Sequence, residues 1–207
     1  MRLNDILDSV SSYAPNADLD VIMRAYVFSA KAHAGQMRKS GEPYLIHPLA
    51  VAGILAELKM DVDTIATGLL HDTMEDCLVT EQDIHELFGP EVSEMVDGVT
   101  KIGKLEFTSK EEAQAENFRK MVLAMARDVR VILVKLSDRL HNMRTMEHMK
   151  PSRRRAISQE TLDIYAPIAN RLGLSSFKTE LEDLCFRYLH PEVYAQLAKK
   201  LDQRQAE

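Results

Sequence analysis

An adjacent histidine and aspartate, His71 and Asp72, end an apolar run and are followed closely by Glu75 and Asp76. Side chains four positions apart lie on the same face of a helix, so these ionisable groups are expected to form two neighbouring columns. Three carboxylates in so small a space repel one another unless a cation lies between them. Taken alone, a His-Asp pair is weak evidence, because it often marks only the end of a surface helix.

A second polar group begins at Asp138, with His141, Asn142 and Thr145 following at helical spacing after strongly apolar turns. This spacing predicts a polar stripe on a helix that is otherwise buried, and buried polar side chains need partners. A hydrogen-bonded structural network would also account for the stripe.

A third histidine, His47, precedes Pro48, a residue that favours the first position of a helix, so we expect His47 at the N-cap. A histidine there is usually a cap or a core residue. In combination with the two polar groups, however, it completes a set of two imidazoles and two carboxylates. Such a mixed nitrogen and oxygen set suits manganese, iron or zinc rather than calcium. We therefore predict a site for one metal ion, with the ligands His47, His71, Asp72 and Asp138.

A metal ion held there would lower the pKa of a bound water and polarise the phosphorus atom that the resulting hydroxide attacks. Glu75 and Asp76 are the candidates to orient that water or to carry its proton. A solvated helix end would also explain these two carboxylates. The combination favours hydrolysis of a phosphate compound.

A basic loop, residues 36–44, comes just before His47 and contains Arg38, Lys39 and Ser40. A guanidinium can stack on a nucleobase or bind phosphate through two hydrogen bonds, and a lysine adds a point charge. A phosphorylated nucleotide would suit this loop, whereas a solvated turn would explain the basic residues without any ligand.

The elements that position these groups are predicted to be helices throughout, so the fold class is all-α. One helix is expected over residues 63–76. Residues 129–134 are β-branched and apolar, which favours a strand, but the polar residues that follow keep helical spacing, so we predict one buried helix. We expect a single domain of about ten helices, with a polar end over residues 199–207 that resembles a linker.

The bulk properties of the 207-residue chain exclude several classes of protein. Its net charge of −6 argues against a protein that coats nucleic acid. The two isolated cysteines indicate neither a disulfide framework nor a zinc knuckle, which suits a reducing cytosol. No apolar run approaches the roughly 18 residues that span a bilayer, and the amino terminus lacks an apolar signal core. We expect a cytoplasmic protein that does not bind membranes.

Three motifs, in this order along the chain, closely resemble those of the hydrolase domain of the Rel/Spo alarmone synthetase-hydrolases, which has an HD-type fold. They are RKSGEPYLIHP at residues 38–48, HDTMED at 71–76 and KLSDRLHNMRT at 135–145. Three motifs in one order are specific, and the resemblance extends from about residue 19 to residue 207.

The resemblance implies manganese-dependent hydrolysis of ppGpp to GDP and pyrophosphate, and of pppGpp to GTP and pyrophosphate, in the stringent response. It implies that Mn²⁺ is held by His47, His71, Asp72 and Asp138, and that water is activated by Glu75 and Asp76. Five positions would contact the nucleotide: Arg38, which would stack on guanine, and Lys39, Ser40, Asn142 and Thr145. The resemblance also implies that residues 1–160 form the hydrolase domain and that residues 161–207 form a helical segment leading toward a synthetase domain. A longer natural chain would carry that GTP pyrophosphokinase domain and regulatory domains.

Two other functions stay open from the sequence. One is a metal-dependent phosphohydrolase for another nucleotide such as NADPH, which a comparison of turnover on ppGpp and NADPH would distinguish. The other is a catalytically silent alarmone-binding module, which tight binding without turnover would support. Residues 101–109, a loop with Gly103, are expected to lie near the site and to help gate it.

Overall fold

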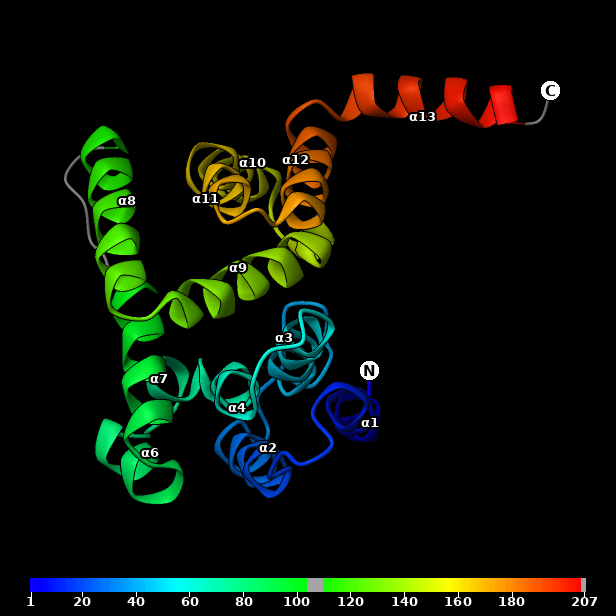
Figure 1. Ribbon diagram of the computed structural model, residues 1–207. Helices are drawn as coiled ribbons and strands as arrows, with labels where there is room; N and C mark the ends of the chain where they lie inside the picture. Colours follow the sequence, from blue (N-terminus) through cyan, green and yellow to red (C-terminus); the bar gives the residue numbers. More distant parts are fainter. Residues whose placement is uncertain (104–109, 206–207) are drawn as a thin grey trace. The chain divides into compact units, whose positions relative to one another are not determined.

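The computed structural model describes residues 1–103 and 110–205, and apart from one isolated bridge every regular element in these residues is helical (Figure 1). The all-α prediction is confirmed. The elements are α1 (Leu3–Tyr13), α2 (Asp20–Ala32), α3 (Ile46–Glu57), α4 (Val62–Leu70), α5 (Thr73–Asp76), α6 (Glu81–Phe88), α7 (Pro90–Gly103), α8 (Lys110–Arg127), α9 (Val129–Arg144), the 3₁₀ turn η1 (Met146–His148), α10 (Pro151–Glu160), the π-helical turn η2 (Thr161–Tyr165), α11 (Ala166–Arg171), α12 (Ser175–Leu189) and α13 (Pro191–Gln205).

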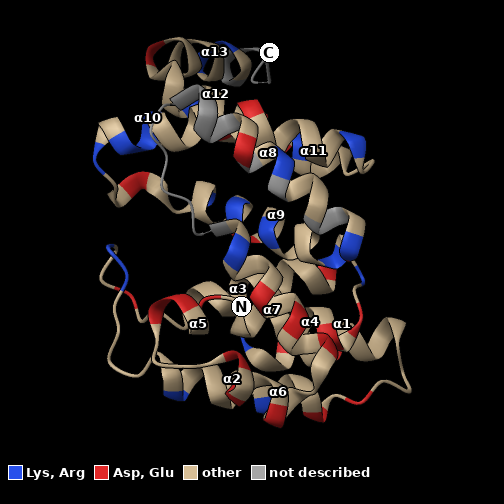
Figure 2. Cartoon of the chain, turned by 90° about the vertical axis from the view of Figure 1, so that its left-hand side faces the viewer, with Lys and Arg blue, Asp and Glu red and all other residues tan. Residues whose placement is uncertain are grey.

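The chain divides into two compact units, Met1–His141 and Asn142–Glu207. The functional boundary predicted after residue 160 stays a prediction. In the second unit α12 packs against α10 and α11. Arg153, Arg154 and Arg155 follow one another on α10, where the cartoon carries the blue of basic residues (Figure 2). None of the helices in the described ranges is long and apolar enough to cross a membrane.

The core of the first unit forms where α4 packs against both α2 and α3. Nearly every side chain of α3 is buried, which matches a sequence that is apolar around the whole helix. The approach of α3 to α4 is close at Gly68, because a Cβ atom there would lie 2.6 Å from Leu55 Cδ1. Gly68 thus lets α3, which carries His47, pack tightly against α4, which ends beside His71.

The apolar residues 129–134 form the start of α9, so the prediction of a buried helix instead of a strand is confirmed. Asp128 caps this helix by accepting a 2.8 Å hydrogen bond from the backbone N–H of Arg130. Ile132, Leu136 and Leu140 are buried along its length. The helical spacing of the core residues, together with the cap, outweighs the strand preference of β-branched residues.

The prediction of a single helix over residues 63–76 is wrong, because the helix is interrupted at His71 and Asp72, between α4 and α5. Side chains here compete with backbone N–H groups for backbone carbonyls. His71 Nδ1 lies 2.7 Å from the Gly68 carbonyl oxygen, and Thr73 Oγ1 donates to the Leu70 carbonyl oxygen at 2.7 Å. Such side-chain bonds offer carbonyls an alternative to the helical ladder. The short helix α5 then carries Glu75 and Asp76.

The segment expected to form a gating loop is only partly described. Residues 101–103 belong to α7, which ends at Gly103, so they are helical. Residues 104–109 lie outside the described residues, and the gating hypothesis stays untested.

Candidate metal centre

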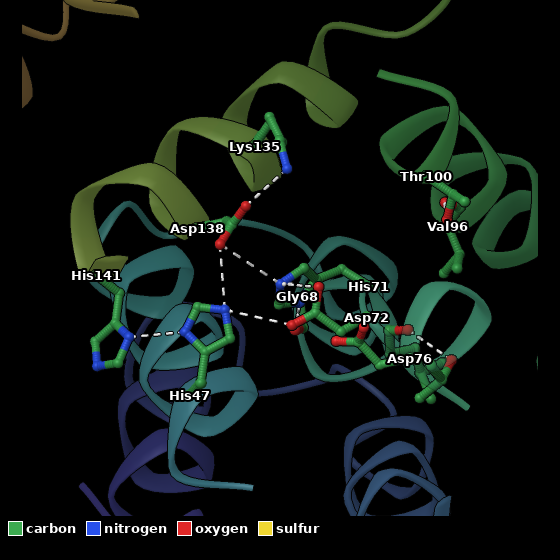
Figure 3. A network of polar contacts seen from close by, with 12 residues as sticks. His47, Gly68, His71, Asp72, Asp76, Val96, Thr100, Lys135, Asp138 and His141 are labelled. Atoms are coloured by element: carbon green, nitrogen blue, oxygen red, sulfur yellow. Dashed lines mark hydrogen bonds and ion pairs between the residues drawn. The ribbon is translucent and has the colours of Figure 1, made fainter. Parts of the chain in front are cut away.

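Four helices of the first unit bring the predicted ligands together in one cluster (Figure 3). His47 Nε2 lies 3.2 Å from Asp138 Oδ1 and 3.4 Å from Asp72 Oδ2. His71 Nε2 lies 3.1 Å from Asp72 Oδ1 and 3.8 Å from Asp138 Oδ1. His47, His71 and Asp138 each offer a ligand atom within 4.8 Å of the others, so one ion could contact all three.

His47 enters the cluster from the first turn of α3, although not from the N-cap as predicted. Leu45 is the N-cap and Ile46 the first helical residue, so His47 and Pro48 lie two positions deeper in the turn than predicted. The correction is small, because proline is tolerated throughout the first helical turn, where backbone N–H groups have no helical partner. The side chain of His47 is 3% exposed.

His71 presents a nitrogen that suits a metal ion. Its Nδ1 is 2.7 Å from the Gly68 carbonyl, which accepts hydrogen bonds only and therefore places a proton on Nδ1. Its Nε2 is buried and makes no hydrogen bond within the described part of the chain. A backbone carbonyl behind one imidazole nitrogen is the usual way in which the other nitrogen is oriented for metal binding. This buried nitrogen, which faces the carboxylates of Asp72 and Asp138, fits the divalent ion that the ligand set implies.

The charges of the cluster favour deprotonated carboxylates. Burial opposes ionisation of Asp138, but the Lys135 ammonium, 2.8 Å from Oδ2, and both histidines hold its pKa well below the usual range. Burial also opposes ionisation of Asp72, whose pKa is nevertheless lowered by His71. Burial alone would lower the pKa of His71, but Asp72 and Asp138 outweigh it and raise this pKa to about 10. The cluster without an ion thus holds a cation in the form of a protonated imidazole.

His47 differs from His71 in the direction of its pKa shift and in the group that its Nδ1 contacts. Burial is the largest influence on His47 and lowers its pKa, against the opposing effect of Asp138. Its Nδ1 lies 2.8 Å from Nδ1 of His141, a buried side chain on α9. A neutral His47 is the form that can offer a lone pair to a metal ion.

Tyr44 connects the cluster with the acidic residues of α5. Its hydroxyl lies 2.8 Å from Asp72 Oδ2 and 2.6 Å from Asp76 Oδ2. Glu75 lies on the same short helix, and its pKa is raised by partial burial, with the nearby carboxylates of Asp72 and Asp76 adding to the effect. A carboxyl group with a raised pKa is suited to taking up and releasing a proton.

The basic loop that carries the predicted nucleotide contacts is a tight turn between α2 and α3. Its arms are joined by an isolated bridge between Met37 and Pro43, and Arg38 N donates to the Glu42 carbonyl at 2.8 Å. Gly41 turns the chain with a φ of +83°, a conformation that glycine adopts without strain. The side chain of Lys39 is exposed, whereas Arg38 and Ser40 are half-buried.

Asn142 and Thr145 belong to the second unit, Asn142 in the last turn of α9 and Thr145 just beyond it. Thr145 Oγ1 lies 3.4 Å from the Asn142 carbonyl oxygen. Their role in nucleotide binding stays a prediction, as do the roles assigned to Arg38, Lys39 and Ser40.

Three residues near the cluster were not among the predicted ligands, proton carriers or nucleotide contacts: Tyr44, Lys135 and His141. Each lies inside one of the three motifs. His141 and Lys135 stand three positions from Asp138 on a helix, a spacing that places side chains on adjoining turns. That spacing placed His141 in the predicted polar stripe and brings Lys135 near Asp138, whereas the contact of Tyr44 with Asp72 depends on how the helices pack.

Comparisons with known proteins identify relatives along most of the chain. The model of the HD domain family matches residues 25–175. The chain is 62% identical over 202 residues to a GTP pyrophosphokinase of Myxococcus xanthus, a match that covers 96% of this chain and 27% of that protein. It is 53% identical over 185 residues to the bifunctional (p)ppGpp synthase/hydrolase SpoT of Escherichia coli strain K12, covering 89% and 26%.

Another relative is the guanosine-3′,5′-bis(diphosphate) 3′-pyrophosphohydrolase of Vibrio cholerae, which is 53% identical over 195 residues, covering 94% of this chain and 28% of that protein. The chain therefore spans little more than a quarter of the length of these curated relatives. A solved structure of "a metazoan ortholog of SpoT" that "hydrolyzes ppGpp and plays a role in starvation responses" superimposes with a TM-score of 0.65. It is 28% identical, and the match covers 81% of this chain and 94% of the other.

Proposed function

Because the chain belongs to the HD domain family, we propose that it is a metal-dependent pyrophosphohydrolase that removes the 3′-pyrophosphate from ppGpp and pppGpp. The observation that carries this proposal is the buried cluster of two imidazoles and two carboxylates. The names of the relatives supply the substrate, since two of them are called (p)ppGpp hydrolases.

We infer that the ligands of the ion are His47, His71, Asp72 and Asp138, and that the ion is Mn²⁺, which rests on the Rel/Spo resemblance. When bound, a divalent ion there supplies a polarised phosphorus centre and a water of lowered pKa. His71 offers the buried nitrogen that makes no hydrogen bond in the described part of the chain, and Asp138 directs Oδ1 toward both histidines. Lys135 holds the other oxygen of Asp138.

Glu75 and Asp76 are the proposed proton carriers. Water attacks the phosphorus atom that is bonded to O3′, a new phosphorus–oxygen bond forms, and the bond between phosphorus and O3′ breaks. The proton lost by the water goes to a carboxylate, and O3′ takes up a proton as it leaves. The raised pKa of Glu75 suits this exchange, and Asp76 is held in position by the Tyr44 hydroxyl.

The proposed nucleotide contacts lie in the basic loop and at the end of α9. Arg38 would stack on guanine, Lys39 and Ser40 would bind phosphate, and Asn142 and Thr145 would lie near the nucleotide. The greater length of the relatives supports a natural protein with additional synthetase and regulatory domains, in which residues 161–207 lead from the hydrolase toward the synthetase. We place such a protein in the cytoplasm, without nucleic acid as a partner of this segment.

Pyrophosphate release from ppGpp by the purified chain, with and without Mn²⁺, tests the proposal. We expect metal-dependent release that falls by about a thousandfold or more in Asp72→Ala, because the reaction loses a metal ligand. Asp8→Ala is the matched control, since Asp8 is an exposed aspartate on α1. Absence of release from folded, metal-loaded protein would refute ppGpp hydrolysis. Turnover of NADPH, or tight alarmone binding without turnover, would then identify which of the other two functions applies.

A further inference from the structure

His141 lies beside the proposed metal site without being one of its ligands. It is buried on α9, three residues after Asp138, and its Nδ1 lies 2.8 Å from Nδ1 of His47 (Figure 3). The two rings are inclined by 36°, with their centroids 5.0 Å apart. Two histidine nitrogens at this distance share one proton, so one of them donates and the other accepts.

The direction of this hydrogen bond decides whether His47 can bind a metal ion. A neutral imidazole carries one proton, on either Nδ1 or Nε2. Nε2 of His47 faces Asp138 Oδ1 at 3.2 Å and Asp72 Oδ2 at 3.4 Å, so it is the nitrogen that points into the cluster. For Nε2 to offer its lone pair, the proton has to be on Nδ1. The Nδ1–H of His47 then donates to His141, whose own proton is on Nε2.

The carboxylates of the cluster favour the opposite arrangement. A proton on Nε2 of His47 could be donated to Asp138, and it would block the lone pair that an ion needs. His71 avoids this conflict because the Gly68 carbonyl accepts from its Nδ1. His47 has His141 at the corresponding position, and His47 is too deeply buried for water to replace that acceptor easily.

We propose that His141 is a positioning residue that accepts the Nδ1 proton of His47 and thereby keeps Nε2 of His47 available to the metal ion. The inference rests on the proposed metal site and extends it by one residue. His141 acts through His47 and does not touch the ion itself. An outer hydrogen-bond partner of this kind typically contributes about 10- to 100-fold to metal affinity.

Two substitutions separate an acceptor from a space-filling side chain. His141→Leu fills much of the same volume without a polar atom, whereas His141→Asn can place an amide oxygen near the position of Nδ1. We expect the Mn²⁺ dissociation constant to rise about 10- to 100-fold in His141→Leu and to stay within about threefold of the unaltered value in His141→Asn. Titration calorimetry with Mn²⁺ alone, without nucleotide, measures both values.

Ser137→Ala is the matched control, because Ser137 is buried on the same helix and its hydroxyl donates to Leu133 of that helix. Its Mn²⁺ affinity should equal that of the unaltered chain. Thermal unfolding without metal ion verifies that each variant is folded. Mn²⁺ affinity of folded His141→Leu equal to that of the unaltered chain would overturn the proposal, and so would equally weak binding by His141→Leu and His141→Asn.

A measurement without any substitution tests the same hydrogen bond. In nitrogen-15 histidine spectra of the chain loaded with diamagnetic Zn²⁺, we expect His47 to carry its proton on Nδ1 and His141 on Nε2. A proton on Nδ1 of His141 would refute the proposed direction. Failure of the unaltered chain to bind any divalent ion would instead overturn the metal site itself, and this inference with it.

Discussion

At the scale of single residues, Tyr44 links two carboxylates to which the proposed mechanism assigns different tasks. Asp72 is a proposed metal ligand and Asp76 a proposed proton carrier, and the one Tyr44 hydroxyl lies within 2.8 Å of both. Burial, and then the two carboxylates, raise the pKa of Tyr44, so the hydroxyl keeps its proton and acts as a donor. Stacking on His33, at a centroid distance of 4.5 Å, holds the ring in place.

Tyr44→Phe tests this link, because it keeps the stacked ring and removes the hydroxyl. We expect kcat for ppGpp to fall about tenfold, since Asp76 loses its orientation, with Mn²⁺ affinity and KM little changed. Tyr13→Phe is the control, as it removes a hydroxyl that donates to the Met60 carbonyl and has no part in the proposed mechanism. Steady-state kinetics at saturating Mn²⁺ would contradict the link if both variants kept the unaltered kcat.

Glu75→Gln tests proton transfer separately from metal binding. Glutamine has nearly the same shape but cannot accept a proton, so we expect kcat to fall about 10²- to 10⁴-fold while Mn²⁺ affinity is retained. In the unaltered chain Glu75 has to be deprotonated to act as a base. Because burial raises the pKa of Glu75 above its ordinary value of 4.5, the acid limb of the kcat profile should lie above pH 4.5. A variant with normal kcat would remove Glu75 from the mechanism.

At the scale of elements, the site depends on how closely α4 approaches α3 and on where α4 ends. Gly68 affects both features. Its lack of a side chain leaves room for Leu55 on α3, and its carbonyl accepts a hydrogen bond from His71 at the end of α4. A helical glycine usually costs about 1 kcal/mol of stability relative to alanine. Close packing at this crossing offsets that cost.

Gly68→Ala should therefore destabilise the protein, against the usual helix preference. The new methyl group would lie 2.6 Å from Leu55 Cδ1 and 3.5 Å from the Ala52 backbone, and Leu55 is fully buried. We expect a loss of about 1–3 kcal/mol in the free energy of unfolding, measured with denaturant. Gly53→Ala is the control on α3, because the three atoms nearest to its methyl group would all belong to the side chain of the exposed Met1, which can move. Equal stabilisation by both changes would refute the close-packing argument.

At the scale of the whole molecule, a bound ion would join three parts of the chain that are separate in sequence. The ligands come from α3, from α9 and from the junction of α4 with α5. Binding to the folded chain alone stabilises it by mass action, by about 2.7 kcal/mol at an ion concentration one hundred times Kd. For a chain of this length we expect Mn²⁺ to raise Tm by about 5–10 °C.

This stabilisation should increase with pH. The folded-state pKa of His71 is raised from 6.5 to about 10, so in the metal-free protein its proton contributes stability fully below pH 6.5 and progressively less toward pH 10. The ion has to displace that proton. Since Asp72 and Asp138 have lowered pKa values, they stay ionised throughout this window. The increase in Tm on adding Mn²⁺ should thus be larger at pH 8 than at pH 6, and a smaller increase at pH 8 would contradict the assignment of His71.

The sequence by itself determined the helical class, the helical form of residues 129–134 and the ligand types of the proposed site. These properties are local, because they follow from the spacing of apolar side chains and from the chemistry of imidazole and carboxylate groups. Only the tertiary structure decided which side chains contact the proposed ligands from outside the metal site. His141 meets His47 across 94 positions, and Tyr44 meets Asp72 across 28. The periodicity of each helix does not predict such contacts, because they depend on how the helices cross and on where side-chain hydrogen bonds to Gly68 and Leu70 interrupt α4.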